Sequence, residues 1–281
     1  MTNSKQEQTQ MYEPTLTNRE FSLKISIFGI KKANDKIWQL FVLGILAGLY
    51  ISFGGQVCLV ALDQGMGKIW AGTVFSVGLV LVVIAGAELF TGNIIMMVGA
   101  VTRQFPFVRL LRNWLTVYLG NFFGSYVFAL AIWYGGLFGT PGSLNSLGEL
   151  AANVARNKLA LSFGECVIRG ILCNMLVILA IIMATMAKDI ISKIACCVLP
   201  IMVFVACGFE HCVANMFLIP AGLLAEGATL TQQLGMFKNI LPVTLGNIIG
   251  GVLILFIHPN RIRQLKYLLS RNPAAAAGKA D

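Results

Sequence analysis

The sequence predicts an all-α integral membrane protein with six transmembrane helices in two inverted three-helix repeats, in which the second and fifth spans are broken. Three observations predict this fold: an apolar composition, charges that fall in clusters, and a resemblance between the two halves of the chain. Of the 281 residues, 57% are hydrophobic and only 12% are charged. So few charges cannot cover a water-soluble globule, and a chain this apolar is not intrinsically disordered either.

The six spans follow from the long neutral stretches between the charge clusters. A bilayer core of about 30 Å requires about 20 apolar residues of helix. The segments that meet this length are approximately 37–62, 69–101, 113–138, 159–187, 190–222 and 236–257. The chain then divides into an N-terminal segment 1–36, a channel domain 37–258 with repeats at about 37–138 and 159–258, and a C-terminal tail 259–281.

The distribution of Lys and Arg predicts the orientation. Six spans place both termini on one side, and sixteen of the 21 Lys and Arg residues lie in the termini and in the loops on that side. The positive-inside rule therefore predicts a multi-pass protein of the inner (plasma) membrane with both termini in the cytoplasm. The same rule accounts for the net charge of +9, so we expect no nucleic-acid partner.

The seven cysteines are placed as packing residues. All lie within the spans or at their breaks, and none forms a CxxC pair or a Cys/His spacing typical of a metal site. We therefore expect no metal, no cofactor and no enzymatic activity. A membrane redox enzyme is the alternative, and a visible spectrum of the purified protein would test it.

Two sequence frames recur in the two halves of the chain. The frame N-x-L-x-V-x-L-G-N-x-x-G occurs at 113–124 and again at 239–250, an offset of 126 residues. The frame G-x-E-x-x-x-x-N occurs at 86–93 and again at 208–215, an offset of 122 residues. Each repeat therefore holds three spans.

An odd number of spans in each repeat has a topological consequence. The second copy must enter the membrane from the opposite face, as in channels and transporters whose substrate site lies near the midplane. Gly48 and Gly170 also lie 122 residues apart, so we expect them to be equivalent in spans 1 and 4. A pore for water or neutral polyols has the same architecture and is a second alternative.

Polar residues interrupt the second and fifth spans at membrane depth. Non-helical backbone is tolerated there only where it is buried or lines a cavity, so we expect a half-helix, a loop and a second half-helix in each span. The second half-helices are predicted to begin near Asn93 and near Asn215. Their N-termini favour an anion. Glu88 and Glu210 are expected to accept hydrogen bonds from loop N–H groups and to hold the breaks in shape.

His211 is the candidate pore residue. It is one of two histidines, lies at the fifth-span break and directly follows Glu210. Histidine is the side chain whose ordinary pKa is closest to neutrality, so it can hold or donate a proton under mild conditions. The alternative is a histidine that merely packs in the core.

The break sequences resemble those of the formate/nitrite transporter family. They are LFTGN at 89–93 and GFEHCVANMF at 208–217, and further matches run from GIKKA at 29–33 to GNIIGG at 246–251. The resemblance implies an aquaporin-like six-helix fold and a homopentamer with a pore in each protomer. It also implies passage of small monovalent anions such as formate, nitrite and hydrosulfide.

The resemblance also implies roles for individual residues. His211 would face the pore centre, with Thr91 as its hydrogen-bonding counterpart. Lys158, at the mouth of span 4, would attract anions in the outer vestibule, and Asn174 would line the path. Residues 21–30 would belong to an amphipathic helix that gates the cytoplasmic mouth. The apolar constrictions would be formed by Phe75 and Phe204 on the outer side and by Leu79, Leu89, Phe90 and Val177 on the inner side.

These roles lead to a hypothesis for transport. A bare anion meets a desolvation cost of several kcal/mol in an apolar slit, whereas a neutral acid meets far less. Lys158 and the half-helix N-termini would concentrate the anion, His211 would donate a proton, and Thr91 would orient the substrate. Formate is the preferred substrate, with nitrite and hydrosulfide as alternatives. Aquaporin-type pores carry Asn-Pro-Ala breaks, and neither break here contains Pro.

Overall fold

The computed structural model describes residues 15–140 and 142–257. The tail 259–281 and the first part of the N-terminal segment therefore lie outside the described residues. Within them the chain is mostly helical, and five helices are long and apolar enough to cross a membrane. They are Ile37–Asp63, Gly67–Gly86, Phe107–Tyr134, Phe163–Met186 and Leu230–Ile257. Shorter apolar helices cover Phe90–Val101, Ile190–Ala206 and Cys212–Ala225.

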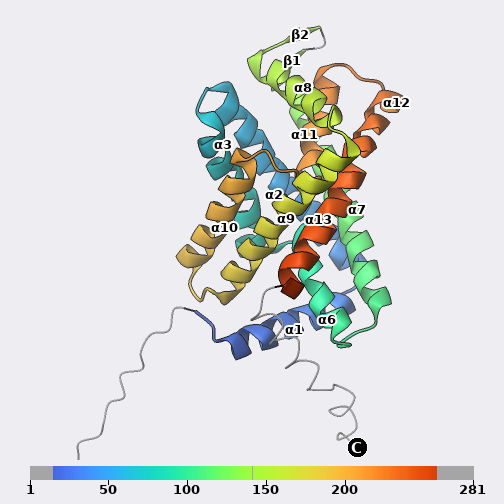
Figure 1. Ribbon diagram of the computed structural model, residues 1–281. Coiled ribbons are helices and arrows are strands. Elements are labelled where there is room, and N and C mark those ends of the chain that lie inside the picture. Colours follow the sequence, from blue (N-terminus) through green and yellow to red (C-terminus); the bar gives the residue numbers. More distant parts are fainter. Residues whose placement is uncertain (1–14, 141, 258–281) are drawn as a thin grey trace, which may run out of the picture.

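Two pairs of long helices form the body of the molecule (Figure 1). One pair is α2 (Ile37–Asp63) with α7 (Phe107–Tyr134), and the other is α9 (Phe163–Met186) with α13 (Phe237–Ile257). Each pair crosses at glycines, because a side chain there would meet the backbone of the partner helix.

The crossing glycines correct the expected equivalence of Gly48 and Gly170. The counterpart of Gly170 is Gly44. A Cβ at Gly44 would lie 3.0 Å from the carbonyl oxygen of Val117, and a Cβ at Gly170 would lie 2.7 Å from that of Val243. Val117 and Val243 are 126 residues apart, as are Gly44 and Gly170. The crossing helices are thus related by an offset of 126 residues, and only the breaks are related by the offset of 122 residues.

The chain between α2 and α7 changes its helical type several times before it breaks. The elements in order are α3 (Gly67–Phe75), α4 (Val77–Leu81), the π-helix η1 (Val82–Gly86), α5 (Phe90–Asn93), the 3-10 helix η2 (Ile94–Met96) and α6 (Met97–Val101). Residues 87–89 between η1 and α5 are not helical. A π-helical turn of this kind often lies at a functional site.

The chain between α9 and α13 breaks at the corresponding place. Helix α10 (Ile190–Ala206) ends before residues 207–211, which are not helical, and α11 (Cys212–Ala225) follows. Gly86 is the last residue of η1 and Gly208 follows the end of α10, and their φ angles of 87° and 71° are ones that other residues rarely adopt.

The inner helices begin earlier than the sequence predicts. Helix α5 starts at Phe90 and α11 at Cys212, whereas the starts were expected near Asn93 and Asn215. Those asparagines lie in the first turn of each helix and not at its start. The reason is that an extended residue, Leu89 or His211, directly precedes each helix as its N-cap.

Two further helices lie across the ends of the molecule (Figure 1). We call these ends the α1 face and the α8 face. Helix α1 (Asn18–Asn34) begins at a capping box of Thr17 and Glu20. Helix α8 (Ser146–Leu159) follows a hairpin of β1 (Gly139–Thr140) and β2 (Ser143–Leu144). The short helices α12 (Leu230–Gln233) and η3 (Leu234–Met236) precede α13.

Helix α8 corrects the prediction for Lys158. Span 4 was expected to start at residue 159, but a capping box of Ser162 and Glu165 starts α9 at Phe163. Lys158 therefore belongs to the last turn of α8. Span 3 is also displaced, because α7 runs from Phe107 to Tyr134 and not over 113–138.

Candidate functional site

The two breaks meet at a contact between Thr91 and His211. Thr91 lies in the first turn of α5, and His211 is the residue before α11. The hydroxyl oxygen of Thr91 lies 2.9 Å from Nε2 of His211, and both side chains are buried. The pairing predicted for these two residues is therefore present at the interior ends of two helices.

The second nitrogen of His211 defines the resting state of its ring. The backbone N–H of Ala214 donates to Nδ1 at 3.1 Å, so that the imidazole caps α11. A nitrogen that accepts a hydrogen bond carries no hydrogen, so in the neutral ring the hydrogen is on Nε2 and is donated to Thr91. A second proton on the ring requires that the Ala214 bond break.

Aromatic rings cover one side of the histidine. The ring of Phe204 stacks on His211, with centroids 5.9 Å apart and planes at 15°. Phe75 meets Phe204 edge-on at 5.6 Å. The two phenylalanines predicted to form the outer constriction are thus in contact with each other, and one of them contacts the histidine.

The residues predicted for the inner constriction separate into two groups. Leu79, Leu89 and Val177 are buried. Phe90 is also buried, but its ring packs edge-on against Tyr118 and Trp114 of α7, with centroid distances of 4.9 and 6.0 Å. The structure therefore brings Phe90 together with α7.

Asn174 lies beside the first break with one half of its amide unpaired. Its Nδ2 donates to the carbonyl oxygen of Asn247 at 2.7 Å and to that of Thr91 at 3.5 Å. These two acceptors fix the orientation of the amide, because only the nitrogen can donate. Its Oδ1 is a buried acceptor without a hydrogen-bond partner among the described residues.

An asparagine holds the start of each inner helix. The N–H of Phe90 donates to Oδ1 of Asn121, and the N–H of Cys212 donates to Oδ1 of Asn247, both at 2.9 Å. The first free donor of each helix is thus already satisfied, although the positive end of the dipole still points into the protein. No role was predicted for these two asparagines, although both belong to the repeated frame at 113–124 and 239–250.

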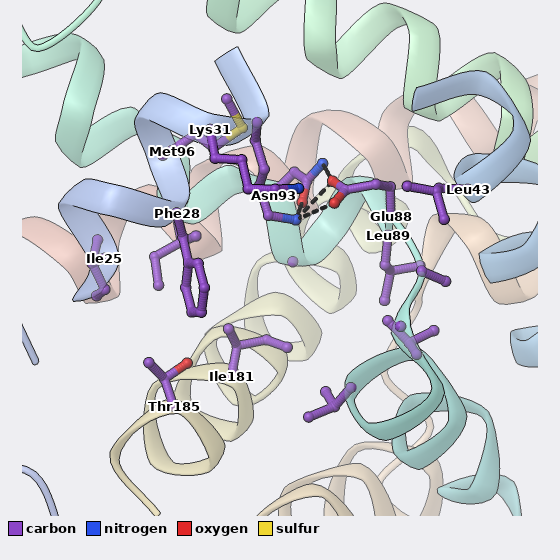
Figure 2. Close-up of a pocket in the computed structure, with 18 of the residues that line it drawn as sticks. Ile25, Phe28, Lys31, Leu43, Glu88, Leu89, Asn93, Met96, Ile181 and Thr185 are labelled. Carbon is purple, nitrogen blue, oxygen red and sulfur yellow. Dashed lines mark hydrogen bonds and ion pairs between the residues drawn. The ribbon is translucent and has the colours of Figure 1, made fainter. Parts of the chain in front are cut away.

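A cluster of charged and polar side chains lies at the first break, on the side of α1 (Figure 2). Nζ of Lys32 lies 2.7 Å from both carboxylate oxygens of Glu88 and 2.9 Å from Oδ1 of Asn93. Nδ2 of Asn93 donates to Glu88 at 2.7 Å and to Oδ1 of Asn113 at 2.9 Å. The ammonium group of Lys32 and the carboxylate of Glu88 therefore neutralise each other.

The second break has the same cluster on the α8 face. Nζ of Lys158 lies 2.8 and 2.9 Å from the carboxylate oxygens of Glu210. Nδ2 of Asn215 donates to Glu210 at 2.6 Å and to Oδ1 of Asn239 at 2.7 Å. Lys158, predicted to attract anions, is thus neutralised by a carboxylate.

These clusters correct the role expected for the two glutamates. Their carboxylates accept from lysine and asparagine side chains, whereas loop N–H groups were expected as donors. The prediction also missed Lys32. The offset of 126 residues that relates the crossing helices maps Lys158 onto Lys32 and could have found it.

A cavity of about 550 Å³ lies between α1, the first break and α9 on the α1 face (Figure 2). Glu88 and Asn93 form its polar wall with Lys32. Apolar side chains, among them Phe28 and Ile181, line the rest. The wall contains Leu89 and Gly92 of the first break, so the cavity reaches the residues on either side of Thr91 in the sequence.

Long apolar helices make this chain a multi-pass membrane protein, and a buried polar centre between two interior helix starts is typical of channels and transporters. The sequence model described as Formate/nitrite transporter matches residues 19–259. The chain therefore belongs to the formate/nitrite transporter family.

Individual relatives agree with the family assignment. The formate channel FocA of Haemophilus influenzae is 36% identical over 245 residues, which cover 79% of this chain and 86% of that protein. A solved pentameric formate channel with formate bound is 34% identical, with a TM-score of 0.68, and covers 85% of this chain and 99% of its own. A solved FNT family ion channel is 27% identical, with a TM-score of 0.75, and covers 90% and 99%.

Proposed function

We propose that this protein is a homopentamer in which each protomer carries small monovalent anions, formate foremost, across the membrane past Thr91 and His211. The observation that carries the proposal is the buried contact between these residues, 2.9 Å long, at the interior starts of α5 and α11. Relatives named as formate channels support formate. Nitrite and hydrosulfide are the alternative substrates within the family.

The proposed architecture has six membrane crossings in two inverted repeats. Helices α10 and α11 together make one crossing, and the helices from α3 to α6 make another. The matching clusters of Lys32 with Glu88 and of Lys158 with Glu210 support this interpretation, because they lie at opposite faces of the molecule. The excess of Lys and Arg toward the α1 face supports a cytoplasmic location for that face.

The walls of the proposed path favour a neutral species at the centre. The two lysines at the breaks, Lys32 and Lys158, are both paired with carboxylates, so neither offers an uncompensated charge to a passing anion. On one side of His211 lie Phe204 and, in contact with it, Phe75. An apolar wall of this kind admits a protonated acid more readily than a bare anion.

Proton exchange at His211 supplies that neutral form. An imidazolium holds hydrogens on both nitrogens, so it forms only when the bond from Ala214 to Nδ1 opens. Transfer of one ring proton to formate then gives formic acid and a neutral imidazole. The hydroxyl of Thr91 orients the substrate, and the unpaired Oδ1 of Asn174 is an acceptor for the acid's O–H.

The apolar residues around the centre form the proposed constrictions. Phe75 and Phe204 close the path toward the α8 face. Leu79, Leu89 and Val177 close it toward the α1 face. Phe90 supports the inner constriction from behind through its contacts with α7.

The experiment separates the two functions of His211, capping a helix and exchanging a proton. Asparagine is a good N-cap residue, so the variant His211→Asn keeps a cap on α11 but cannot exchange a proton. Formate flux into liposomes is expected to fall by about a hundredfold, the size of a typical general acid–base contribution. The remaining flux should lose its rise toward acidic pH. His211→Ala serves as the variant that loses both functions.

The results distinguish the proposal from its alternatives. Wild-type flux of formate after His211→Asn, with unchanged pH dependence, contradicts proton exchange at this residue. Permeation of glycerol rather than formate by the wild-type protein contradicts the anion pathway and supports a pore for neutral solutes. Planar-bilayer recording with formate, nitrite and hydrosulfide in turn ranks the substrates.

A further inference from the structure

A second, smaller cavity lies on the α1 face beside the large one. Its volume is about 140 Å³, and it lies where α1 passes the end of α9 and the start of α10. Phe28, Val83, Ile181 and Thr185 line both cavities. The smaller cavity, called the side chamber below, therefore adjoins the larger one, whose wall includes residues of the first break.

Two lysines line the side chamber, one from each of two helices. Lys24 comes from α1 and Lys193 from the first turn of α10. Nζ of Lys24 donates to the carbonyl oxygen of Thr185 at 3.2 Å and lies 5.9 Å from the centre of the Phe28 ring. Both lysines are half-buried, and both contribute to the lining of the chamber.

The charge of this pair is not neutralised within the described part of the chain. Neither lysine has an ion pair there, and no carboxylate of those residues lines the chamber. Burial, and then the charge of Lys193, lower the pKa of Lys24. The two ammonium groups thus disfavour each other, and an anion between them would relieve the repulsion.

We propose that Lys24 and Lys193 form a docking site for a small monovalent carboxylate at the side chamber, from which the anion passes into the large cavity. This inference rests on the proposed function, and it adds where the anion is collected on the α1 face. The chamber volume of about 140 Å³ suits an anion of a few atoms. Uncompensated positive charge at the mouth of a cleft raises the local concentration of anions and their rate of capture.

The contrast with the two half-buried lysines at the breaks favours this pair. Lys32 and Lys158 each have a glutamate within 2.8 Å, whose carboxylate neutralises the charge of the ammonium group. Within the described part of the chain, the ammonium of Lys24 contacts a carbonyl oxygen and an aromatic ring and no carboxylate. A passing anion therefore meets net positive charge at the side chamber before it meets the neutral cluster at Glu88.

The experiment compares uptake from the two sides of the membrane. Formate uptake is measured against formate concentration in inside-out vesicles, which present the cytoplasmic face, and in right-side-out vesicles. The double variant Lys24→Gln/Lys193→Gln should raise the half-saturating concentration about tenfold in inside-out vesicles, with little change in the maximal rate. Right-side-out vesicles should be unaffected. Lys36→Gln/Lys188→Gln removes two exposed lysines near the same face and should change neither value.

The possible results distinguish a failure of the docking site from a failure of the proposed formate transport. If wild-type vesicles take up no formate, the proposed function fails. If wild-type uptake is normal and the double variant matches it from both sides, or is weakened equally from both, the docking site is overturned. Purified Lys24→Arg/Lys193→Arg keeps the charge and should restore the wild-type half-saturation, which excludes a folding defect.

The same ammonium pair could hold the phosphate of an anionic lipid. Liposomes of phosphatidylcholine alone and liposomes with phosphatidylglycerol distinguish the two sources. A docking site for formate predicts the same defect in both. A defect confined to phosphatidylglycerol liposomes overturns the proposal and assigns the pair to a lipid headgroup.

Discussion

The first and second breaks share a framework but differ at the centre. Each has a positive-φ glycine, a lysine paired with glutamate, and an asparagine that satisfies the first N–H of the inner helix. With the break offset of 122 residues, the counterpart of His211 is Leu89 and the counterpart of Thr91 is Val213. The repeated residues build the breaks, and the residues that are not repeated supply the chemistry of the proposed pore.

The two breaks also differ in how deeply their ion pairs are enclosed. The side chains of Lys158 and Glu210 are 15% and 5% exposed, compared with 23% and 10% for Lys32 and Glu88. The first cluster forms a wall of the large cavity. The same chemical cluster is thus more buried on the α8 face than on the α1 face.

The largest expected effect is on protein stability, and it tests this difference in the burial of the two ion pairs. Glu210→Gln leaves the ammonium of Lys158 buried and unpaired, which is expected to destabilise the protein by roughly 3–5 kcal/mol. Glu88→Gln should cost less, because Lys32 is nearer to the cavity. Thermal unfolding of the purified proteins in one detergent measures both.

A double variant shows whether the loss comes from the unpaired charge. Lys158→Met/Glu210→Gln removes the ammonium as well, and it should recover much of the stability lost in Glu210→Gln. Equal losses for Glu88→Gln and Glu210→Gln would mean that the difference in exposure has no energetic consequence.

The next effect tests the equivalence of the two helix crossings. A Cβ at Gly120 would lie 2.6 Å from the carbonyl oxygen of Phe41, and a Cβ at Gly246 would meet that of Val167. Gly120→Ala and Gly246→Ala are each expected to destabilise by roughly 1–3 kcal/mol through overpacking. The control is Gly235→Ala, since a Cβ at Gly235 has no neighbour within 4 Å. Thermal unfolding measures all three, and harmless substitutions at both crossings would contradict the packing argument.

The membrane character of the chain was predictable from the sequence because lipid imposes strong constraints. Apolar helices of about 20 residues between charge clusters predicted five stretches that the structure shows as long apolar helices. Over the span predicted at 190–222, where a break was expected, the structure has two shorter apolar helices. Surface helix α8 was missed because its residues are polar enough to be read as a loop.

The site was predictable where a residue type is unusual at its depth. His211, Glu88 and Glu210 were identified because ionisable groups are rare in an apolar span. The partners of the two glutamates were not predictable in the same way. Lys32 and Lys158 lie on surface helices, and their approach to the breaks depends on how α1 and α8 pack.

The smallest expected effect concerns the residues that differ between the breaks. Thr91→Val removes the acceptor for Nε2–H of His211 and makes the first break resemble the second, where Val213 is the counterpart. A buried donor without a partner costs about 1–3 kcal/mol, so formate flux should fall about tenfold if about 1.4 kcal/mol of this appears in the barrier.

The matched variants for this position are Thr91→Ser and Val213→Thr. Serine keeps the hydroxyl that lies 2.9 Å from His211 in the wild-type protein, so Thr91→Ser should retain most of the flux in the same liposome assay. A hydroxyl added at Val213 in the Thr91→Val background should not restore it, because residue 213 lies in the first turn of α11, in the same break as His211, whereas the partner of Nε2 comes from α5. Recovery of flux in that double variant would show that a hydroxyl from either break is sufficient. The chemistry would then depend on the shared framework and not on the residues in which the two breaks differ.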